Sequence, residues 1–429
     1  RPPEDNSFKP LDDQSSQIAI PHPTILLLGP TGSGKSTMVN RVYGQRLADT
    51  GVGRPVTQCL QLYGSPSSWV RLYDYPGIET ENAQQWRDTL GRQLNELQGD
   101  ENKRVHVVWY FVTMGPSRWQ DNDDRNCRFL KRRQLPVIIV LLHADNSSSQ
   151  DIAEMKRTIK HSLGAETPVF SSSMGLRAPS ECPRCQSDEL ATIARSRIWR
   201  CTTCGHSGPW SRLNHEVRGL EQATYDELTK IDPNLGDMHV AAQVVDLKRK
   251  IPMLTGIILS AAISAGVTGA AVVVPLVEIP AIAGIQSGML VSLGVATGVP
   301  LERYPWLLVS YAGMQLLTGL AALGLPELLK FIPGLGTVAG GAISASVGPV
   351  LTVAMGVLYS VALFKVRQQM NDNEEGVLSE AAVNQIMASV VSTQNIKRLF
   401  VKVKNLNRAE FKQEHRGIVA SLIGIEIDP

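Results

Sequence analysis

The segment Gly29–Ser36 constrains this chain more than any other part, because its sequence GPTGSGKS has the spacing G-x-x-x-x-G-K-S. The apolar run Thr24–Leu28 directly before it favours a buried strand. Glycines at these positions let successive backbone N–H groups turn towards phosphate oxygens, at the start of a helix whose dipole favours negative charge. The segment therefore predicts binding of a nucleoside triphosphate. A glycine turn that only joins a strand to a helix is the alternative.

A second segment, Asp74–Gly77, follows a predicted strand over 70–73. A carboxylate at the end of a strand beside a phosphate loop is where a Mg²⁺ partner belongs. The backbone N–H of Gly77 can meet a γ-phosphate, because glycine has no side chain in the way. In the phosphate loop, Lys35 is expected to reach the outer phosphates and the Ser36 hydroxyl is expected to bind Mg²⁺.

Downstream of this turn, polar helical patterns alternate with apolar strands. Strands are predicted over 105–112, 136–142 and 168–170, and helices over 81–97, 121–133 and 151–163. This alternation predicts an α/β fold with a doubly wound mixed sheet that is mostly parallel, and with ligand loops at the carboxyl ends of its strands.

The stretch 25–173 resembles a small regulatory GTPase of the Era-like branch, in the TRAFAC class. Gly29–Ser36 matches the phosphate loop of that family, Thr57 its switch threonine, and Asp74–Gly77 its Mg²⁺ and γ-phosphate turn. The resemblance implies GTP and GDP as ligands, with Mg²⁺ held by Ser36, Thr57 and Asp74. It also implies that GTP hydrolysis depends on Lys35, Thr57 and Gly77.

The base-reading segment departs from the family's pattern. His143 and Asp145 lie where the resemblance places an Asn-Lys-x-Asp motif, and only the aspartate is kept. Ile78 stands in place of the glutamine that orients water in Ras-type enzymes, so slow hydrolysis without a partner is expected. The nucleotide-binding residues that follow from the motif and the resemblance are Gly29, Pro30, Thr31, Gly32, Ser33, Gly34, Lys35, Ser36, Thr37, Asp74, His143, Asp145 and Ser172.

Four of the six cysteines form two C-x-x-C pairs, Cys182/Cys185 and Cys201/Cys204, with fifteen residues between the pairs. This spacing predicts a structural Zn²⁺ ribbon inserted over 178–210, with an accidental or redox pairing as the alternative. Four thiolate ligands close the coordination sphere, so the metal is expected to be structural. Arginine and tryptophan side chains in the ribbon allow contact with nucleic acid, but a small module that needs zinc to fold is the simpler interpretation.

The stretch between Lys250 and Lys365 is almost free of charge. The runs without a charged residue are 251–277, 279–301, 304–326 and 331–364. Each is long enough to cross a hydrocarbon layer of about 30 Å. The stretch 215–365 also resembles a YcjF-type membrane-associated domain, through its segments 241–250, 279–288 and 332–336. We therefore expect helical hairpins that enter a membrane; a soluble alanine- and glycine-rich bundle or an oligomer interface is the alternative.

The predicted organisation is a flexible lead-in, a GTPase domain, a linking helix, an all-α hydrophobic hairpin domain and a soluble helical tail. These parts cover 1–20, 21–235, 236–250, 251–365 and 366–429. The predicted function is a membrane-associated, GTP-hydrolysing switch with its GTPase domain on the cytoplasmic or equivalent internal face. Its expected partners are the lipid bilayer, a second copy of the chain and an activator protein. An RNA- or ribosome-associated GTPase is the alternative, which 42 basic against 40 acidic residues do not favour.

Overall fold

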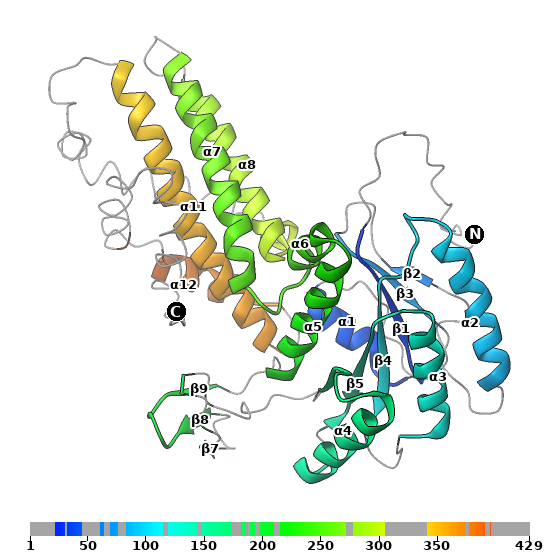
Figure 1. Ribbon diagram of the computed structural model, residues 1–429. Coiled ribbons are helices and arrows are strands. Elements are labelled where there is room, and N and C mark those ends of the chain that lie inside the picture. Colours follow the sequence, from blue (N-terminus) through cyan, green and yellow to red (C-terminus); the bar gives the residue numbers. More distant parts are fainter. Residues whose placement is uncertain are drawn as a thin grey trace, which may run out of the picture.

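The computed structural model describes residues 22–30, 32–44, 61–63, 69–75, 83–114, 119–144, 147–172, 182, 184–185, 187, 189–193, 198–209, 215–271, 278–304, 341–373, 377–390 and 395. Within these ranges a six-stranded sheet lies beside a set of long helices, with a small three-stranded sheet set apart from both (Figure 1).

The large sheet has the strand order β2-β3-β1-β4-β5-β6. Its strands are β1 (Thr24–Leu28), β2 (Gln61–Tyr63), β3 (Arg71–Asp74), β4 (Val107–Thr113), β5 (Val137–Leu142) and β6 (Val169–Ser171). Every pairing is parallel except that of β2 with β3. The expected α/β fold with a mixed, mostly parallel sheet is confirmed.

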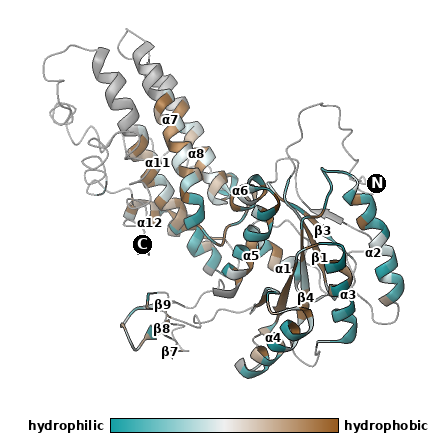
Figure 2. Cartoon of the chain, viewed as in Figure 1, coloured by the Kyte–Doolittle hydropathy of each residue, from teal (hydrophilic) through white to brown (hydrophobic). Residues whose placement is uncertain are grey.

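Helices cover both faces of this sheet, which is why its strands are apolar on both sides. One face packs against α1 (Lys35–Tyr43), α5 (His215–Ile231) and α6 (Pro233–Ala242), and the other against α2 (Ala83–Gln98), α3 (Asp121–Arg132) and α4 (Ser149–Leu163). Along β1, Ile25 and Leu27 belong to the first core, whereas Leu26 and Leu28 belong to the second. Figure 2 shows β1 and β4 largely in brown and much of the outer helix surface in teal.

The predicted linking helix over 236–250 is divided in the structure. Helix α6 ends at Ala242, and only the short 3₁₀ helix η3 (Lys248–Lys250) follows before the next long helix. The reason is the side chain of Gln243, whose Oε1 accepts from the backbone N–H groups of Val245 and Asp246 at 2.6 and 2.8 Å. These bonds give the two backbone N–H groups a partner in the turn, in place of the carbonyl oxygens that a continuing helix would offer.

The charge-poor region forms long helices packed on one another, namely α7 (Ile251–Ala271), α8 (Glu278–Thr297) and α11 (Gly341–Asp372), with α12 (Glu380–Val390) beside them. Pro280 lies in the first turn of α8, where proline is tolerated. Val357, Leu358 and Phe364 of α11 are buried in this core. The segment 332–336, one of the three that carry the resemblance to a YcjF-type domain, lies outside the described residues.

Within the part of the chain that the structure describes, no helix combines the length and the apolar character needed to cross a membrane. The predicted membrane crossings are therefore not supported by these residues.

Candidate nucleotide-binding site

The phosphate loop connects the end of β1 to the start of α1. Gly29 has φ +149°, and its backbone passes close to β4: a Cβ at this position would lie 2.6 Å from the carbonyl oxygen of Phe111. Lys35 is buried and folds back over the loop, where its Nζ donates to the carbonyl oxygens of Gly29 and Pro30 at 3.2 and 3.1 Å. Burial lowers the pKa of the Lys35 ammonium, and the charge of Asp74 opposes this shift.

The side chains of the loop fit a phosphate group. The hydroxyl of Ser33 is buried and has no hydrogen-bond partner among the described residues. A buried hydroxyl in this state costs free energy unless a ligand supplies the missing partner. Together with the Lys35 ammonium at the positive end of α1, Ser33 therefore suits an anionic oxygen ligand.

Asp74 lies at the same edge of the sheet as the phosphate loop. Strands β1 and β3 run parallel, with Leu27 opposite Asp74, and the backbone N–H of Tyr75 donates to the carbonyl oxygen of Leu27 at 3.2 Å. The Asp74 carboxylate is only 4% exposed. Ser36 lies in the first turn of α1, which starts at this same edge. A buried carboxylate and a hydroxyl at this edge are the ligand types that Mg²⁺ takes beside a triphosphate.

The two segments expected to face the base lie side by side. The backbone N–H of Ala144 donates to the carbonyl oxygen of Ser172 at 3.1 Å, and the N–H of Ser172 donates to the carbonyl oxygen of Leu141 at 2.8 Å. His143 adopts a left-handed backbone with φ 56° between them. Arg41 on α1 donates to Ser172 Oγ at 3.2 Å. The sequence pattern did not single out Arg41, because a surface arginine at that helical position carries no motif.

The described residues of the predicted site thus gather along the carboxyl edge of β1, β3, β5 and β6. The remaining predicted site residues, Thr31, Thr57, Gly77 and Asp145, lie outside the described residues, as does Ile78.

The four cysteines of the insertion also come together. Their Sγ atoms all lie within 4.8 Å of one another, with Cys182–Cys204 and Cys185–Cys201 each at 3.6 Å. Tetrahedral Zn–S bonds of about 2.3 Å place sulfur atoms about 3.8 Å apart, so the cluster fits a zinc ion. The strands β7 (Leu190–Ile193), β8 (Ile198–Cys201) and β9 (Ser207–Pro209) support it.

His206 follows the second cysteine pair and offers an imidazole as a further ligand type. It packs edge-on against the buried ring of Trp199, with ring centroids 5.4 Å apart. Among the described residues, the group that could hold a metal ion here consists of the four thiols.

Comparison with known proteins identifies the same part of the chain. Residues 24–143 match a family described as 50S ribosome-binding GTPase. GTPase Der of Salinispora tropica is 25% identical over 230 residues, which are 51% of this chain and 47% of that protein. GTPase Era of Histophilus somni is 25% identical over 130 residues, which are 30% of this chain and 41% of that protein. This chain thus spans less than half the length of either relative.

A solved structure of Era with MgGDPNP and a segment of 16S ribosomal RNA covers 36% of this chain and 52% of its own, at 18% identity and a TM-score of 0.27. A likeness this low supports no conclusion about function. The family match and the curated relatives support an Era- and Der-like P-loop GTPase domain in this part of the chain. The family match ends at residue 143, and the resemblance of 215–365 to a YcjF-type domain stays a prediction.

Proposed function

We propose that the chain is a switch that binds and hydrolyses GTP in its N-terminal domain and passes the nucleotide state to its C-terminal helices. GTP binding and hydrolysis are supported by the Lys35 side chain, which folds over the phosphate loop beside the buried carboxylate of Asp74. Coupling to the C-terminal helices is supported by the position of α1, which begins in the phosphate loop and ends against the helical region.

Each described residue has a definite role in this proposal. Lys35 neutralises the outer phosphates once they displace its bonds to Gly29 and Pro30. Ser36 and Asp74 hold Mg²⁺ together with Thr57, and the metal supplies neutralisation of the phosphate charge. Because Ile78 offers no group that orients water, hydrolysis is slow until an activator protein supplies one.

Nucleotide binding is tested by titrating the full chain with fluorescent GDP, GTP and ATP analogues in the presence of Mg²⁺. The Lys35→Ala variant should bind about 10- to 100-fold more weakly, as expected for the loss of hydrogen bonds from a charged group. Lys103→Ala is the matched control, because Lys103 lies in an exposed turn and its ammonium pairs with Asp100 at 3.0 Å. Equal affinities of the two variants would remove Lys35 from the site.

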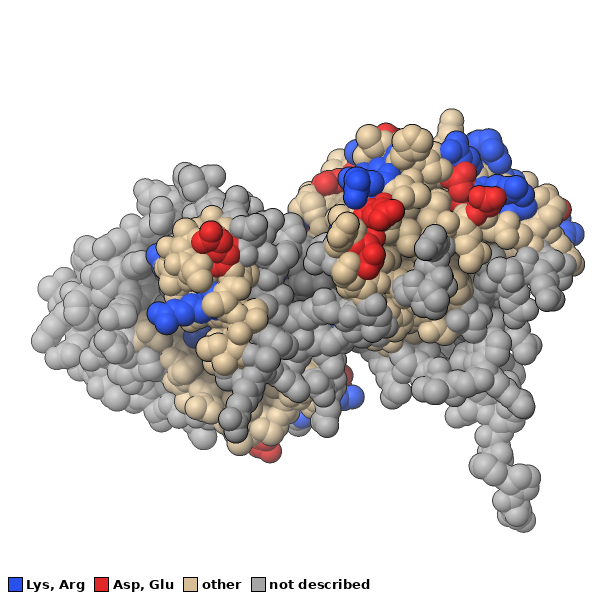
Figure 3. Space-filling view, turned by 90° about the horizontal axis from the view of Figure 1, so that it is seen from below, with Lys and Arg blue, Asp and Glu red and all other residues tan. Residues whose placement is uncertain are grey.

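The proposed output is association of the helical domain with a lipid bilayer, which the charge-free runs over 251–364 support. An RNA- or ribosome-associated role is the second candidate, favoured by the description of the matching family as ribosome-binding. On the face seen in Figure 3, acidic and basic side chains are interspersed over the described surface, which gives RNA no single-sign patch there.

Fractionation separates these two outputs. Pelleting with membranes and release by detergent supports bilayer association. Pelleting that detergent leaves unchanged and nuclease abolishes supports the ribosomal alternative and rejects the bilayer. We also propose that the cysteine cluster holds a structural Zn²⁺ ion, on the strength of its sulfur spacing.

A further inference from the structure

The C-terminal end of α1 is held by residues far away in the sequence. The carbonyl oxygen of Val42 accepts from the backbone N–H of Val244 at 2.8 Å. The carbonyl oxygen of Gly44 accepts from a guanidinium nitrogen of Arg367 at 3.4 Å, across 323 positions of sequence. Since α1 starts at Lys35, one nine-residue helix has the phosphate loop at one end and these contacts at the other.

Arg367 lies on α11 and is only 4% exposed. The nitrogen that donates to Gly44 also donates to the carbonyl oxygen of Gly298, just past α8, at 2.9 Å. The remaining nitrogens, Nε and Nη2, donate to Asn371 Oδ1 at 3.0 and 2.7 Å. Asn371 Nδ2 donates in turn to the carbonyl oxygen of Val244 at 3.0 Å. The guanidinium therefore joins the ends of α1 and α8 and is oriented by a neighbour on its own helix.

The joint, meaning the contacts of Arg367 and Val244 with Gly44 and Gly298, is closely packed. A Cβ on Gly44 would lie 2.6 Å from Arg367 Nη2, and a Cβ on Gly298 would lie 2.5 Å from a methyl group of Val244. Both glycines have positive φ, of 67° and 70°. The backbones of α1 and α8 approach the guanidinium and Val244 more closely than any other residue type would allow.

The electrostatics of the joint are those of helix ends. Burial lowers the pKa of Arg367 to about 10, so the group is still charged at neutral pH. Among the described residues no carboxylate forms an ion pair with it, and its charge is met by the carbonyl ends of two helices and by Asn371. Helix C-termini carry partial negative charge, which makes them suitable partners for a buried cation.

Lys250 makes a similar pair of bonds to the carboxyl ends of two helices. It is fully buried, and its Nζ donates to the carbonyl oxygens of Ala241 at the end of α6 and Ala296 at the end of α8, at 2.8 and 2.6 Å. Arg367 and Lys250 thus gather the carboxyl ends of α1, α6 and α8 at the junction between the sheet domain and the helical domain (Figure 1). Burial, together with the charge of Arg367, lowers the pKa of Lys250 to about 7.

From this geometry we propose that Arg367 is a positioning residue for the nucleotide site: through Gly44 it fixes α1, and therefore Lys35 and Ser36, relative to the helical domain. The inference rests on the proposed GTP-binding function and names the path by which that site is coupled to the helices. A short hydrogen-bonded helix moves as a unit, so a shift at Gly44 displaces the groups that contact phosphate. By linkage, bound nucleotide must stabilise the joint by the same free energy by which the joint strengthens nucleotide binding.

The test uses the full chain and a fluorescent GDP analogue with Mg²⁺. Arg367→Met keeps the unbranched, apolar stem but removes the guanidinium, and it should weaken binding about tenfold, mainly through faster dissociation. Arg367→Lys should restore part of the affinity, because an ammonium still reaches one carbonyl. The control is Tyr359→Phe on the same helix, which removes a buried hydroxyl that has no hydrogen-bond partner among the described residues and lies in the helical core.

Failure of nucleotide binding and failure of the positioning role of Arg367 give different results. If the unsubstituted chain binds neither GDP nor GTP, the proposed function fails and this inference fails with it. If the unsubstituted chain binds but Arg367→Met binds equally well, the inference alone is overturned. Should Arg367→Met not fold, hydrogen exchange on the unsubstituted chain decides: GDP should slow exchange in 363–373, and unchanged exchange there overturns the inference.

Discussion

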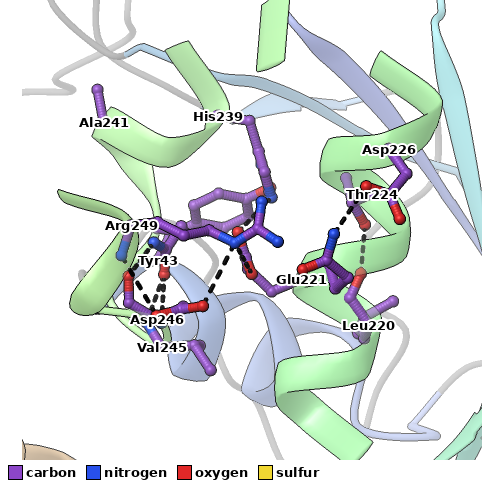
Figure 4. Close-up of polar contacts among 12 residues, drawn as sticks. Tyr43, Leu220, Glu221, Thr224, Asp226, His239, Ala241, Val245, Asp246 and Arg249 are labelled. Atoms are coloured by element: carbon purple, nitrogen blue, oxygen red, sulfur yellow. Dashed lines mark hydrogen bonds and ion pairs between the residues drawn. The ribbon is translucent and has the colours of Figure 1, made fainter. Parts of the chain in front are cut away.

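His239 Nε2 lies 3.8 Å from Glu221 Oε1 in a fully buried setting between the sheet domain and the helical domain, and neither atom has a hydrogen-bond partner among the described residues. Figure 4 shows the neighbours: the Tyr43 hydroxyl contacts His239 Nδ1 at 3.3 Å, and Arg249 Nε lies 3.7 Å from Glu221 Oε2. Burial raises the pKa of Glu221 to about 8 and lowers the pKa of His239 to about 3. Both side chains are therefore mostly neutral at pH 7.

The Glu221→Gln variant should lose part of the pH dependence of stability. The folded pKa of Glu221, about 8, lies above its ordinary value of 4.5, so between these values the folded chain keeps a proton that the unfolded chain has released. The free energy of unfolding should consequently fall as pH rises through this window. Glutamine cannot ionise, so Glu221→Gln should gain stability relative to the unsubstituted chain with rising pH.

Urea unfolding between about pH 5 and about pH 8 measures this difference. Glu227→Gln on the same helix is the control, because its carboxylate pairs with Lys230 at 2.6 Å near the surface. Unfolding curves of Glu221→Gln that shift with pH in parallel with those of the unsubstituted chain would contradict the assignment.

The cysteine cluster should carry one zinc ion per chain. Replacing Cys185 by Ser should abolish zinc retention through dialysis and unfold the small sheet, because the module buries little apart from Trp199 and the cysteines. His206→Ala should retain the metal, since His206 packs on Trp199. Elemental analysis by mass spectrometry measures both. Loss of zinc from His206→Ala alone would place the histidine in the donor set.

The Asp145→Asn variant should shift base preference from guanine towards xanthine nucleotides. A carboxylate accepts two N–H bonds from guanine, whereas an amide side chain matches the altered edge of xanthine. Competition of GTP and XTP for a fluorescent GDP analogue measures the preference. An unaltered preference for GTP would remove Asp145 from the base site.

Those features that depend on local pattern could be predicted from the sequence, and those that depend on contacts between distant segments could not. Strands β4 and β5 and helix α4 lie within two residues of their predicted bounds, because a continuous apolar run or a helical period specifies them locally. Lys35 was found through a motif whose spacing reflects its chemistry.

Arg367 was missed because its partner Gly44 lies 323 positions away, and an arginine after a long apolar helix looks like an ordinary terminal cation. Glu221 was missed for a different reason: its position falls on the buried face of α5 with Val217 and Leu228, but a glutamate in a helix is ordinarily exposed. His239 of α6 and Arg249 of η3 lie beside its carboxylate. The division of the linking helix depended on side-chain bonds of Gln243, which a helical period does not reveal.

The Gly29→Ala variant should show how closely the phosphate loop is built against the sheet. Alanine would place its Cβ 2.6 Å from the carbonyl oxygen of Phe111, and it would also occupy a backbone region with φ +149° that side chains rarely adopt. We expect a loss of about 1–3 kcal/mol in the free energy of unfolding from backbone strain, together with at least about tenfold weaker binding of nucleotide. Gly32→Ala is the matched control for stability, because Gly32 also has positive φ but a Cβ added there would have no atom within 4 Å. Thermal unfolding in the absence of nucleotide measures both variants. If Gly29→Ala were as stable as Gly32→Ala, the contact with Phe111 would not constrain the loop, and the close approach of β4 would have no part in shaping the phosphate site.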